Sequence, residues 1–352
     1  MTDTAPAPAR AAPAGRMRCA QVTGQDLASL SLVEQERPQP GPGEVLLRMT
    51  AASLNYRDLL LLKGRLSVAG RPYVPLSCGC GVVQAVGAGV TRVVPGDRVA
   101  PTFFMDWLHG PRDDRLLLRA LGGPAPGVAS DFICLPEQAL VLAPQILSDL
   151  EVATLPCAAL TAWQALFEAR VTRPGDVVLL LGTGGVSIAA LQFAKAAGAT
   201  VIITSSSDAK LARARALGAD LTINYRQTPD WERRARELSG GAGVDVVLDV
   251  IGSDSQAQAE AALRPGGTLA AIGLLSGHIL RGAQRADIDF QRIRVGSREH
   301  FERMNRAISA NAIRPVIDQV FDLEHLGLAL QLLEAGGAFG KIGIRINSAA
   351  AS

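Results

Sequence analysis

The chain has 352 residues, 48% of them hydrophobic, which is enough apolar content for two cores of ordinary domain size. Its 35 basic and 33 acidic residues give a net charge of +2 and are scattered, so neither a nucleic-acid surface nor an anionic-membrane surface is indicated. The longest apolar runs have the length of a strand, far short of the roughly 20 residues of a membrane-spanning helix. We therefore expect a small-molecule partner, no nucleic acid and no membrane.

The cysteine content and the N-terminal segment indicate the compartment in which the protein resides. Five cysteines, an odd number without the spacing of a disulfide framework, favour a reducing compartment, and we expect a cytoplasmic protein. Residues 1–16 are rich in Ala and Pro and lack the apolar core of a secretory signal, so they are expected to form a disordered tail. No other segment is of low complexity, and no internal repeat is visible.

Residues 17–140 consist of short β-like runs, such as 43–49 and 82–86, separated by Gly and Pro turns. Within 82–99, glycines and the Pro95-Gly96-Asp97 turn punctuate a predicted hairpin. This pattern predicts an all-β region that is barrel-like.

From residue 149 onward the pattern changes to strands that alternate with helices. A helical stretch over 151–169 leads into predicted strands at 177–181, 200–204, 221–223, 244–250, 268–272 and 293–295. Six strands with helical crossovers predict a doubly wound parallel sheet. The remainder is expected to form a helix (301–310), an extended stretch (316–321), a second helix and a last strand (341–346) that folds back onto the first domain.

A glycine-rich turn follows the first of these strands. Gly182 allows the tight turn, and Gly184 lets a pyrophosphate approach the N-terminus of the next helix, where unpaired N–H groups favour an anion. Ser187 stands where the third glycine usually lies. The turn sits inside a six-strand pattern, with Gly252 and Gly273 just after strands four and five, and this context favours dinucleotide binding.

The end of the second strand reads Thr204-Ser205-Ser206-Ser207, where an NAD site usually carries a carboxylate for the ribose 2′-hydroxyl. Hydroxyls leave room for a 2′-phosphate, and Lys210 can supply the charge, which favours NADPH. The competing interpretation is that Lys210 is a solvated helix lysine and that Asp208 is an ordinary acid at a helix N-terminus.

The glycine turn occurs in one order with SLNYRDLLLLKGR (53–65), PGDRV (95–99), TLPCAALTAW (154–163) and ALGADLTINY (216–225). With these motifs the chain resembles the medium-chain dehydrogenase/reductase superfamily over residues 17–346, and more closely its quinone-oxidoreductase and zinc-independent, alcohol dehydrogenase-like branch. The resemblance implies an α/β fold in which a GroES-like β-barrel catalytic domain (17–150, completed by 300–352) accompanies a Rossmann NADP-binding domain (151–299). It also implies a homodimer, since members pair their edge strands.

The resemblance bears directly on zinc. In zinc-dependent members the catalytic ligands stand at the positions of Asn55, Ser77 and Cys157, and only the cysteine remains here. The four cysteines of the structural zinc lobe have no counterpart within 100–131. One thiolate cannot hold tetrahedral zinc, so we expect no metal. A replacement site built from Cys78, Cys157 and Asp58 can be imagined, but buried cysteines are more often core residues.

The resemblance also implies which residues meet the cofactor. In NADPH-specific quinone reductases a Lys and a Tyr fifteen residues apart flank the 2′-phosphate, and Lys210 and Tyr225 have this spacing. The implied nicotinamide contacts are Thr161, Gly252, Gly273 and Leu274, with Lys341 reaching the cofactor from the last segment. The full expected cofactor set is Thr161, Gly182, Gly184, Gly185, Val186, Ser205, Ser206, Lys210, Tyr225, Gly252, Gly273, Leu274 and Lys341.

Asn55, Tyr56, Arg57 and Asp58 are the expected catalytic group, at the mouth where substrate meets nicotinamide; alternatively they only start a helix whose Asp58 ties the backbone. Without a Lewis acid, hydride delivery to a quinone or an activated C=C is the chemistry that suits this pocket. The proton donor stays open among Asn55, Tyr56, Arg57 and water.

Two other functions remain open. One is an alcohol or aldehyde oxidoreductase that recruits zinc, and the other is an NADPH-binding protein with a sensor or structural role. Phe103, Phe104 and Trp107 are equally expected to line the pocket or to pack the barrel. The RDDRLLLRA stretch (112–120) departs from relatives, so the substrate itself is not predicted.

Overall fold

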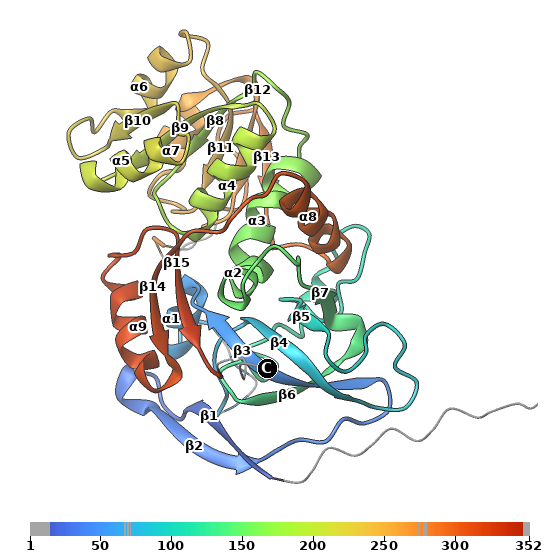
Figure 1. Cartoon of the computed structure of the whole chain (residues 1–352). Coiled ribbons are helices and arrows are strands. Elements are labelled where there is room, and N and C mark those ends of the chain that lie inside the picture. The colour runs from blue at the N-terminus through green and yellow to red at the C-terminus, as the bar shows by residue number, and fades with distance from the viewer. Residues whose placement is uncertain are drawn as a thin grey trace, which may run out of the picture.

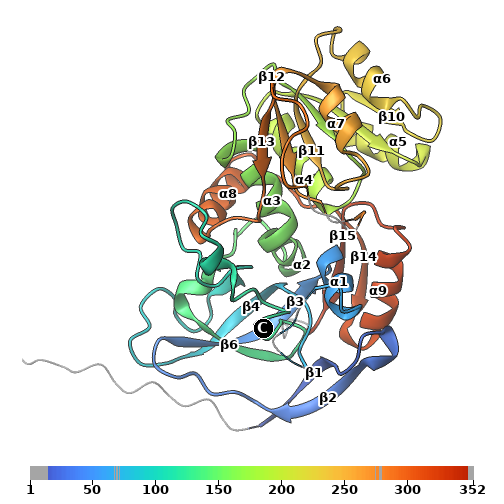
Figure 2. The same cartoon turned by 180° about the vertical axis from the view of Figure 1, so that it is seen from behind.

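The computed structural model describes residues 15–347 except 67, 69, 71, 274 and 277–279. Figures 1 and 2 show two lobes with a column of helices, α2 and α3, between them. In the described part of the chain, no helix is long and apolar enough to cross a membrane. Residues 1–14 of the predicted tail lie outside the described residues, and β1 begins at Arg16, the last residue of that prediction.

The lower lobe of Figure 1 is built on a seven-stranded sheet in the order β14-β15-β3-β4-β5-β7, with β6 also paired to β3. Its strands are β3 (Glu44–Ser53), β4 (Cys78–Val86), β5 (Arg98–Pro101), β6 (Phe132–Pro136), β7 (Leu140–Leu142), β14 (Ile317–Asp322) and β15 (Lys341–Arg345). Alternate residues Val45, Leu47 and Met49 of β3 point into one buried cluster, as the two-residue period of a strand requires. Beside this sheet lie the antiparallel pair β1 (Arg16–Val22) and β2 (Leu30–Glu36) and the helices α1 (Tyr56–Leu62) and α9 (Leu326–Glu334).

The C-terminal segment belongs to this lower sheet. β15 runs antiparallel to β3, and β14 runs parallel to β15. The strand that brings Lys341 therefore lies directly beside the strand that leads to Asn55. The domain boundaries at 150/151 and 299/300 stay a prediction.

The upper lobe holds six parallel strands in the order β10-β9-β8-β11-β12-β13, which confirms the predicted doubly wound sheet beside a GroES-like barrel. The strands are β8 (Val177–Leu180), β9 (Thr200–Ser205), β10 (Leu221–Asn224), β11 (Val244–Asp249), β12 (Leu263–Ala271) and β13 (Asp289–Arg292). The crossover helices are α4 (Gly185–Ala196), α5 (Asp208–Ala216), α6 (Trp231–Leu238) and α7 (Gln256–Ala262).

The predicted position of the sixth strand was wrong. We predicted it at 293–295, whereas β13 ends at Arg292. Ile293 and Val295 are buried, but they pack into a cluster that also contains Leu160 of the helical column and Trp107 of the lower lobe. Their alternating apolar pattern therefore reflects burial between the lobes. A strand at the edge of the sheet produces the same pattern, which is why the sequence did not separate the two.

The helical column consists of α2 (Asp149–Ala153), α3 (Leu160–Trp163) and the π-helical turns Leu155–Ala159 and Gln164–Glu168. α2 begins at a capping box in which Ser148 N donates to Glu151 Oε2 at 2.8 Å. α8 (Arg298–Ala310) lies beside α3 in both views. Short 3₁₀ turns lie at Leu27–Ser29, Asp114–Leu117, Glu137–Ala139 and Leu323–His325.

Candidate functional site

The glycine turn between β8 and α4 has the geometry of an anion-binding loop. Gly182 has φ +75°, and its N–H donates to Thr204 Oγ1 at 3.1 Å. A Cβ added to Gly182 or to Gly184 would meet no atom of the described residues within 4 Å. Because α4 begins here, the N–H groups of its first turn have no partner within the helix. The turn therefore fits a dinucleotide pyrophosphate.

The next residues explain why this turn lacks the third glycine of the usual dinucleotide-binding motif. The Ser187 side chain is buried, and its Oγ donates to Leu181 O at 2.8 Å, so the hydroxyl closes the strand-to-helix turn. A Cβ on Gly185 would lie 2.6 Å from Cδ of Lys341, so this glycine makes room for the lysine stem. Val186, also an expected cofactor contact, is partly exposed in the first turn of α4.

The expected 2′-phosphate residues lie together after β9 and β10. Tyr225 is 41% exposed, and its backbone N–H donates to Ser205 O at 3.1 Å. Ser205 is buried and Ser206 is partly exposed. The Lys210 ammonium, however, donates to Gly336 O at 2.8 Å and to Ala338 O at 3.0 Å, and burial lowers its pKa. Lys210 is thus not a free surface lysine.

Asp208 is the first residue of α5, directly after Ser207. Its carboxylate accepts hydrogen bonds from Asn224 Nδ2 at 2.8 Å and from Gln227 Nε2 at 3.0 Å. The Asp208 carboxylate at the start of α5 is therefore held by Asn224, the last residue of β10, and by Gln227 in the turn after it.

The floor under the expected nicotinamide is shaped by an aspartate that the sequence reasoning missed. Asp249 Oδ1 accepts from Ile251 N at 2.7 Å and from Gly252 N at 3.0 Å, and burial raises the pKa of this carboxyl. Gly252 has φ +110°, and a Cβ on Gly273 would lie 1.9 Å from Val250 C. The available signal was an acid at the end of a buried strand, three residues before a glycine. Leu274 lies outside the described residues.

Lys341 connects the glycine turn to the expected catalytic group. Only 6% of Lys341 and 8% of Asn55 is exposed. The Lys341 ammonium donates to Asn55 Oδ1 at 2.7 Å and also to Leu54 O. Gly340, just before it, donates to Thr183 O at 3.0 Å, which pins the lysine to the turn. The structure thus brings together Gly185, Lys341 and Asn55, which the sequence placed far apart.

The Asn55 amide is held from both sides. Its Nδ2 donates to Ser77 Oγ at 3.3 Å and to Cys78 Sγ at 3.1 Å, both long or weak contacts. Its backbone N–H donates to Asp58 Oδ2 at 2.8 Å. Burial raises the pKa of the Asp58 carboxyl to about 6, against the effect of this N–H and of the Arg57 and Lys341 charges. Its Oδ1 has no hydrogen-bond partner among the residues that the structure describes. Asp58 therefore positions Asn55.

Tyr56 and Arg57 are less directly placed. The Tyr56 ring packs against the core of the barrel. Arg57 Nη1 donates to Leu121 O at 3.0 Å, its guanidinium lies 4.8 Å from the centroid of the Phe103 ring, and burial lowers its pKa. Phe103, Phe104 and Trp107 are all buried, Trp107 to 1%, so they pack the core while Phe103 also covers Arg57.

The donor set does not fit zinc. Asn55 Oδ1 accepts from an ammonium group, and a positive charge at that position opposes a dication. Cys78 and Cys157 share a hydrogen bond. Burial opposes ionisation of Cys78, but this bond and the Lys341 charge lower its pKa. The same bond and burial raise the pKa of Cys157 against the effect of the Lys341 charge. Among the described residues, no group of three or more His, Cys, Asp or Glu side chains could hold a metal ion.

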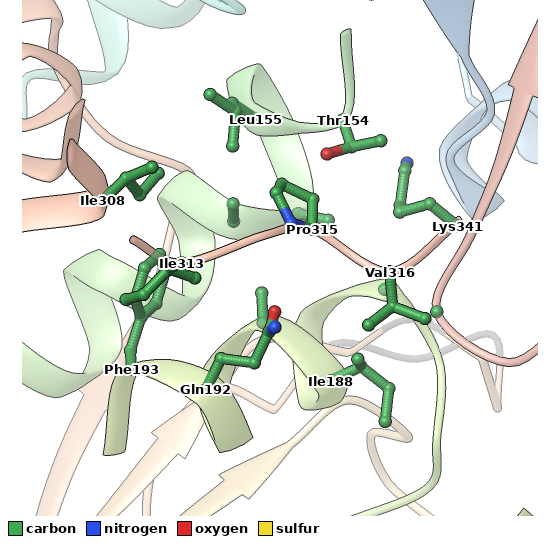
Figure 3. Close-up of a pocket in the computed structure, with 15 residues that line it drawn as sticks. Thr154, Leu155, Ile188, Gln192, Phe193, Ile308, Ile313, Pro315, Val316 and Lys341 are labelled. Atoms are coloured by element: carbon green, nitrogen blue, oxygen red, sulfur yellow. The ribbon is translucent and has the colours of Figure 1, made fainter. Parts of the chain in front are cut away.

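Two further features border the site. Thr161, on α3, is buried. Figure 3 shows a small apolar pocket between α4, α8 and the crossing segment 313–316, with Lys341 at one side. Gln192 of α4 closes over this segment by donating to Arg314 O at 2.7 Å. The C-terminal segment therefore touches the dinucleotide lobe at several points on its way to β15.

Comparison with known proteins identifies the two lobes. Residues 41–145 match the family model described as alcohol dehydrogenase GroES-like domain, and residues 185–310 match that of zinc-binding dehydrogenase. A zinc-type alcohol dehydrogenase-like protein of Schizosaccharomyces pombe is 41% identical over 339 residues, covering 93% of this chain and 97% of that protein. A 2-haloacrylate reductase of a Burkholderia species is 36% identical over 246 residues, covering 68% of this chain and 67% of the enzyme.

Solved structures agree. A thermostable alcohol dehydrogenase from Pyrobaculum aerophilum superposes with a TM-score of 0.82 at 31% identity, covering 94% of this chain and 100% of that one. The quinone oxidoreductase from Coxiella burnetii gives 0.77 at 26% identity, covering 95% and 100%. The solved structures cover 94% and 95% of this chain and therefore both lobes. The chain therefore belongs to the medium-chain dehydrogenase/reductase superfamily, a family of oxidoreductases that use a nicotinamide cofactor.

Proposed function

We propose that this protein is an NADPH-dependent, zinc-independent oxidoreductase that delivers hydride to a quinone or to the β-carbon of an α,β-unsaturated carbonyl. The observation that carries the proposal is the Lys341 ammonium 2.7 Å from Asn55 Oδ1. It places a cation and an amide N–H donor where zinc-dependent relatives have a metal ligand. A preorganised donor of this kind stabilises an oxygen that gains negative charge.

The preference for NADPH rests on the residues after β9. We expect the Ser205 and Ser206 hydroxyls, Lys210 and Tyr225 to surround the place where NAD sites hold a carboxylate. The one nearby acid, Asp208, is held by Asn224 and Gln227. The two carbonyls that Lys210 now contacts are neutral acceptors. A phosphate group is a stronger acceptor for an ammonium, so we infer that Lys210 exchanges these carbonyls for the 2′-phosphate.

A bound reduced nicotinamide supplies the hydride for this chemistry. The hydride forms a new C–H bond at the β-carbon, the C=C electron pair shifts to give an enolate, and a proton completes the α-carbon. Asn55 Nδ2 would give up its weak contacts with Ser77 and Cys78 to donate to the enolate oxygen. Lys341 would polarise the amide through Oδ1. Because Tyr56 packs on the barrel and Arg57 is engaged by Leu121, water is the proton source that we favour.

A second candidate is an alcohol dehydrogenase that recruits zinc. It is favoured by the contact between Cys78 and Cys157 and by the alcohol dehydrogenase names of several relatives. It would require a third protein ligand and displacement of the Lys341 charge. An NADPH-binding sensor without turnover is the remaining alternative, and hydride transfer to a simple quinone separates it from both enzymes.

The direct experiment is a screen of quinones, enones, aldehydes and alcohols, with NADPH and NADH as cofactors, on protein dialysed with and without a chelator. We expect turnover of quinones or enones with NADPH that is insensitive to the chelator. Turnover confined to alcohols or aldehydes, lost on chelation and restored by zinc, would replace this proposal with the second candidate.

The role of Asn55 has a matched control. Asn55→Ala should lower kcat by about a hundred- to a thousandfold, the loss typical of an oxyanion donor, with a smaller effect on NADPH binding. Asn305 is also a buried asparagine, and it lies away from the site. Its Nδ2 donates to Leu142 O at a distance of 3.1 Å. Asn305→Ala should leave kcat nearly unchanged. Equal losses in both variants would remove Asn55 from the mechanism.

We also propose that the protein is a homodimer. β13 pairs only with β12 in the described sheet, which leaves a strand edge open for a second copy. Light scattering on the purified protein should give twice the mass of one chain, and a single-chain mass would contradict the proposal.

A further inference from the structure

The connection between α9 and β15, residues 336–340, lies against the dinucleotide lobe. Figures 1 and 2 show α9 and β14 on the side of the lower lobe that faces α5. Lys210 of α5 donates from its ammonium group to Gly336 O at 2.8 Å and to Ala338 O at 3.0 Å. The lysine that we expect to bind the 2′-phosphate therefore holds the 336–340 segment of the other lobe.

The same segment continues to the other parts of the candidate site. Phe339 is buried, and the Arg213 guanidinium of α5 lies 4.2 Å from the centroid of its ring. Gly340 N donates to Thr183 O of the glycine turn at 3.0 Å, and the next residue is Lys341, which binds the expected catalytic group. The 336–340 segment thus runs from the expected 2′-phosphate site, past the glycine turn, to the catalytic lysine.

Lys210 has neutral partners in this arrangement. Among the described residues, no carboxylate accepts a hydrogen bond from its ammonium group, and both acceptors are backbone carbonyls. The nearby Asp318 carboxylate is bound by Arg213 Nη1 at 2.8 Å. Burial lowers the pKa of Lys210 against the effect of the Asp318 charge, and the Arg213 charge lowers it further. A phosphate group would be a stronger acceptor for Lys210 than either carbonyl.

The bound position of the segment depends on the backbone of Gly336. This residue follows the C-cap of α9, has φ +65°, and donates its N–H to Leu333 O at 3.1 Å. A Cβ added to Gly336 would meet no atom of the described residues within 4 Å. Glycine is therefore favoured at this position by the left-handed backbone, which residues with a Cβ rarely adopt, and not by lack of space.

We propose that the 336–340 segment competes with the cofactor 2′-phosphate for Lys210 and thereby determines the affinity for NADPH. This inference rests on the proposed function, since it concerns the same NADPH site. NADPH takes Lys210 from the Gly336 and Ala338 carbonyls and releases the segment, whereas NADH, which lacks the 2′-phosphate, leaves the contact in place. Because the two sets of acceptors exclude each other, a weaker hold on Lys210 by the segment strengthens NADPH binding.

Cofactor affinities of glycine variants, measured by calorimetry, test this competition. Alanine disfavours the left-handed backbone of the bound segment, so Gly336→Ala should bind NADPH up to about tenfold more tightly and NADH as before. Gly336→Asn, which tolerates this backbone, should bind both cofactors like the wild type. Gly89→Ala is the matched control, because Gly89 has φ +82° and equal space for a Cβ but lies in the loop after β4. Unchanged or weaker NADPH binding by a Gly336→Ala variant that still binds NADH overturns the proposal.

Amide hydrogen exchange tests the release of the segment itself. In the protein without cofactor, Lys210→Met should speed exchange at Gly337 and Ala338. Lys195→Met, which removes another lysine bound to a carbonyl, Ala199 O at 2.9 Å, should leave exchange at these two amides unchanged. In the wild type, NADPH should speed this exchange relative to NADH. Exchange that Lys210→Met leaves unchanged overturns the proposal.

The two measurements separate this inference from the proposed function. Tighter NADPH binding by Gly336→Ala supports the competition even when no quinone or enone is reduced, and that result would overturn only the proposed reaction. A wild type that prefers NADPH but shows the same exchange at Gly337 and Ala338 with both cofactors overturns the competition and leaves the NADPH assignment standing.

Discussion

Asp58→Asn should make the protein more stable at neutral pH. Burial raises the pKa of the Asp58 carboxyl from 3.8 to about 6. Between these values the folded protein keeps a proton that the unfolded chain has lost, so stability falls as pH rises through this window. The difference corresponds to a cost of about 3 kcal/mol once the carboxyl is ionised in the fold. Asparagine removes this cost and keeps an oxygen that can accept from Asn55 N.

The assay is urea unfolding of the wild type and the variant across this pH range. The variant should gain up to about 3 kcal/mol at about pH 8 and nearly nothing at about pH 3, where Asp58 is mostly protonated in both states. Asp220→Asn is a control of opposite sign. Burial opposes ionisation of Asp220, but hydrogen bonds from Lys195 and Val201 lower the pKa of this carboxyl. Asp220→Asn should therefore lower the free energy of unfolding at neutral pH. A pH-independent difference for Asp58→Asn would refute the reasoning.

Three further predictions concern the cofactor and the metal. Lys210→Ala should weaken NADPH binding about ten- to a hundredfold and leave NADH binding unchanged. The control Lys195→Ala, which removes a lysine bound to Asp220, should leave the binding of both cofactors unchanged. Unchanged NADPH affinity in Lys210→Ala would refute the 2′-phosphate site. Lys341→Met keeps the stem against Gly185 and should lower kcat about a hundred- to a thousandfold, with NADPH binding measured separately by fluorescence; full activity would show that the ammonium is idle. Elemental analysis of protein never exposed to added metal should find no stoichiometric zinc, and finding it would overturn the metal-free pocket.

The sequence predicted the architecture because its signals are local. A buried strand followed by a glycine turn and a helix, repeated with crossovers, allows few topologies, and the observed strand order follows. The one misplaced strand shows the limit of this reasoning. Ile293 and Val295 are buried by the other lobe, and burial between lobes leaves the same apolar pattern as burial in a sheet.

The site was less predictable, because its contacts join residues far apart in the chain. Asn55 and Lys341 were both expected near the nicotinamide, but nothing local indicates that they bond to each other across 286 positions. The same holds for Lys210, whose partners are carbonyls of residues 336 and 338.

The central claim is that hydride reaches the β-carbon of an activated C=C. The measurement that tests it most directly uses NADPH deuterated at the transferred position and an enone substrate, followed by NMR of the product. We predict deuterium on the β-carbon of a saturated ketone. Deuterium on the carbinol carbon of an allylic alcohol would show carbonyl reduction and contradict the account.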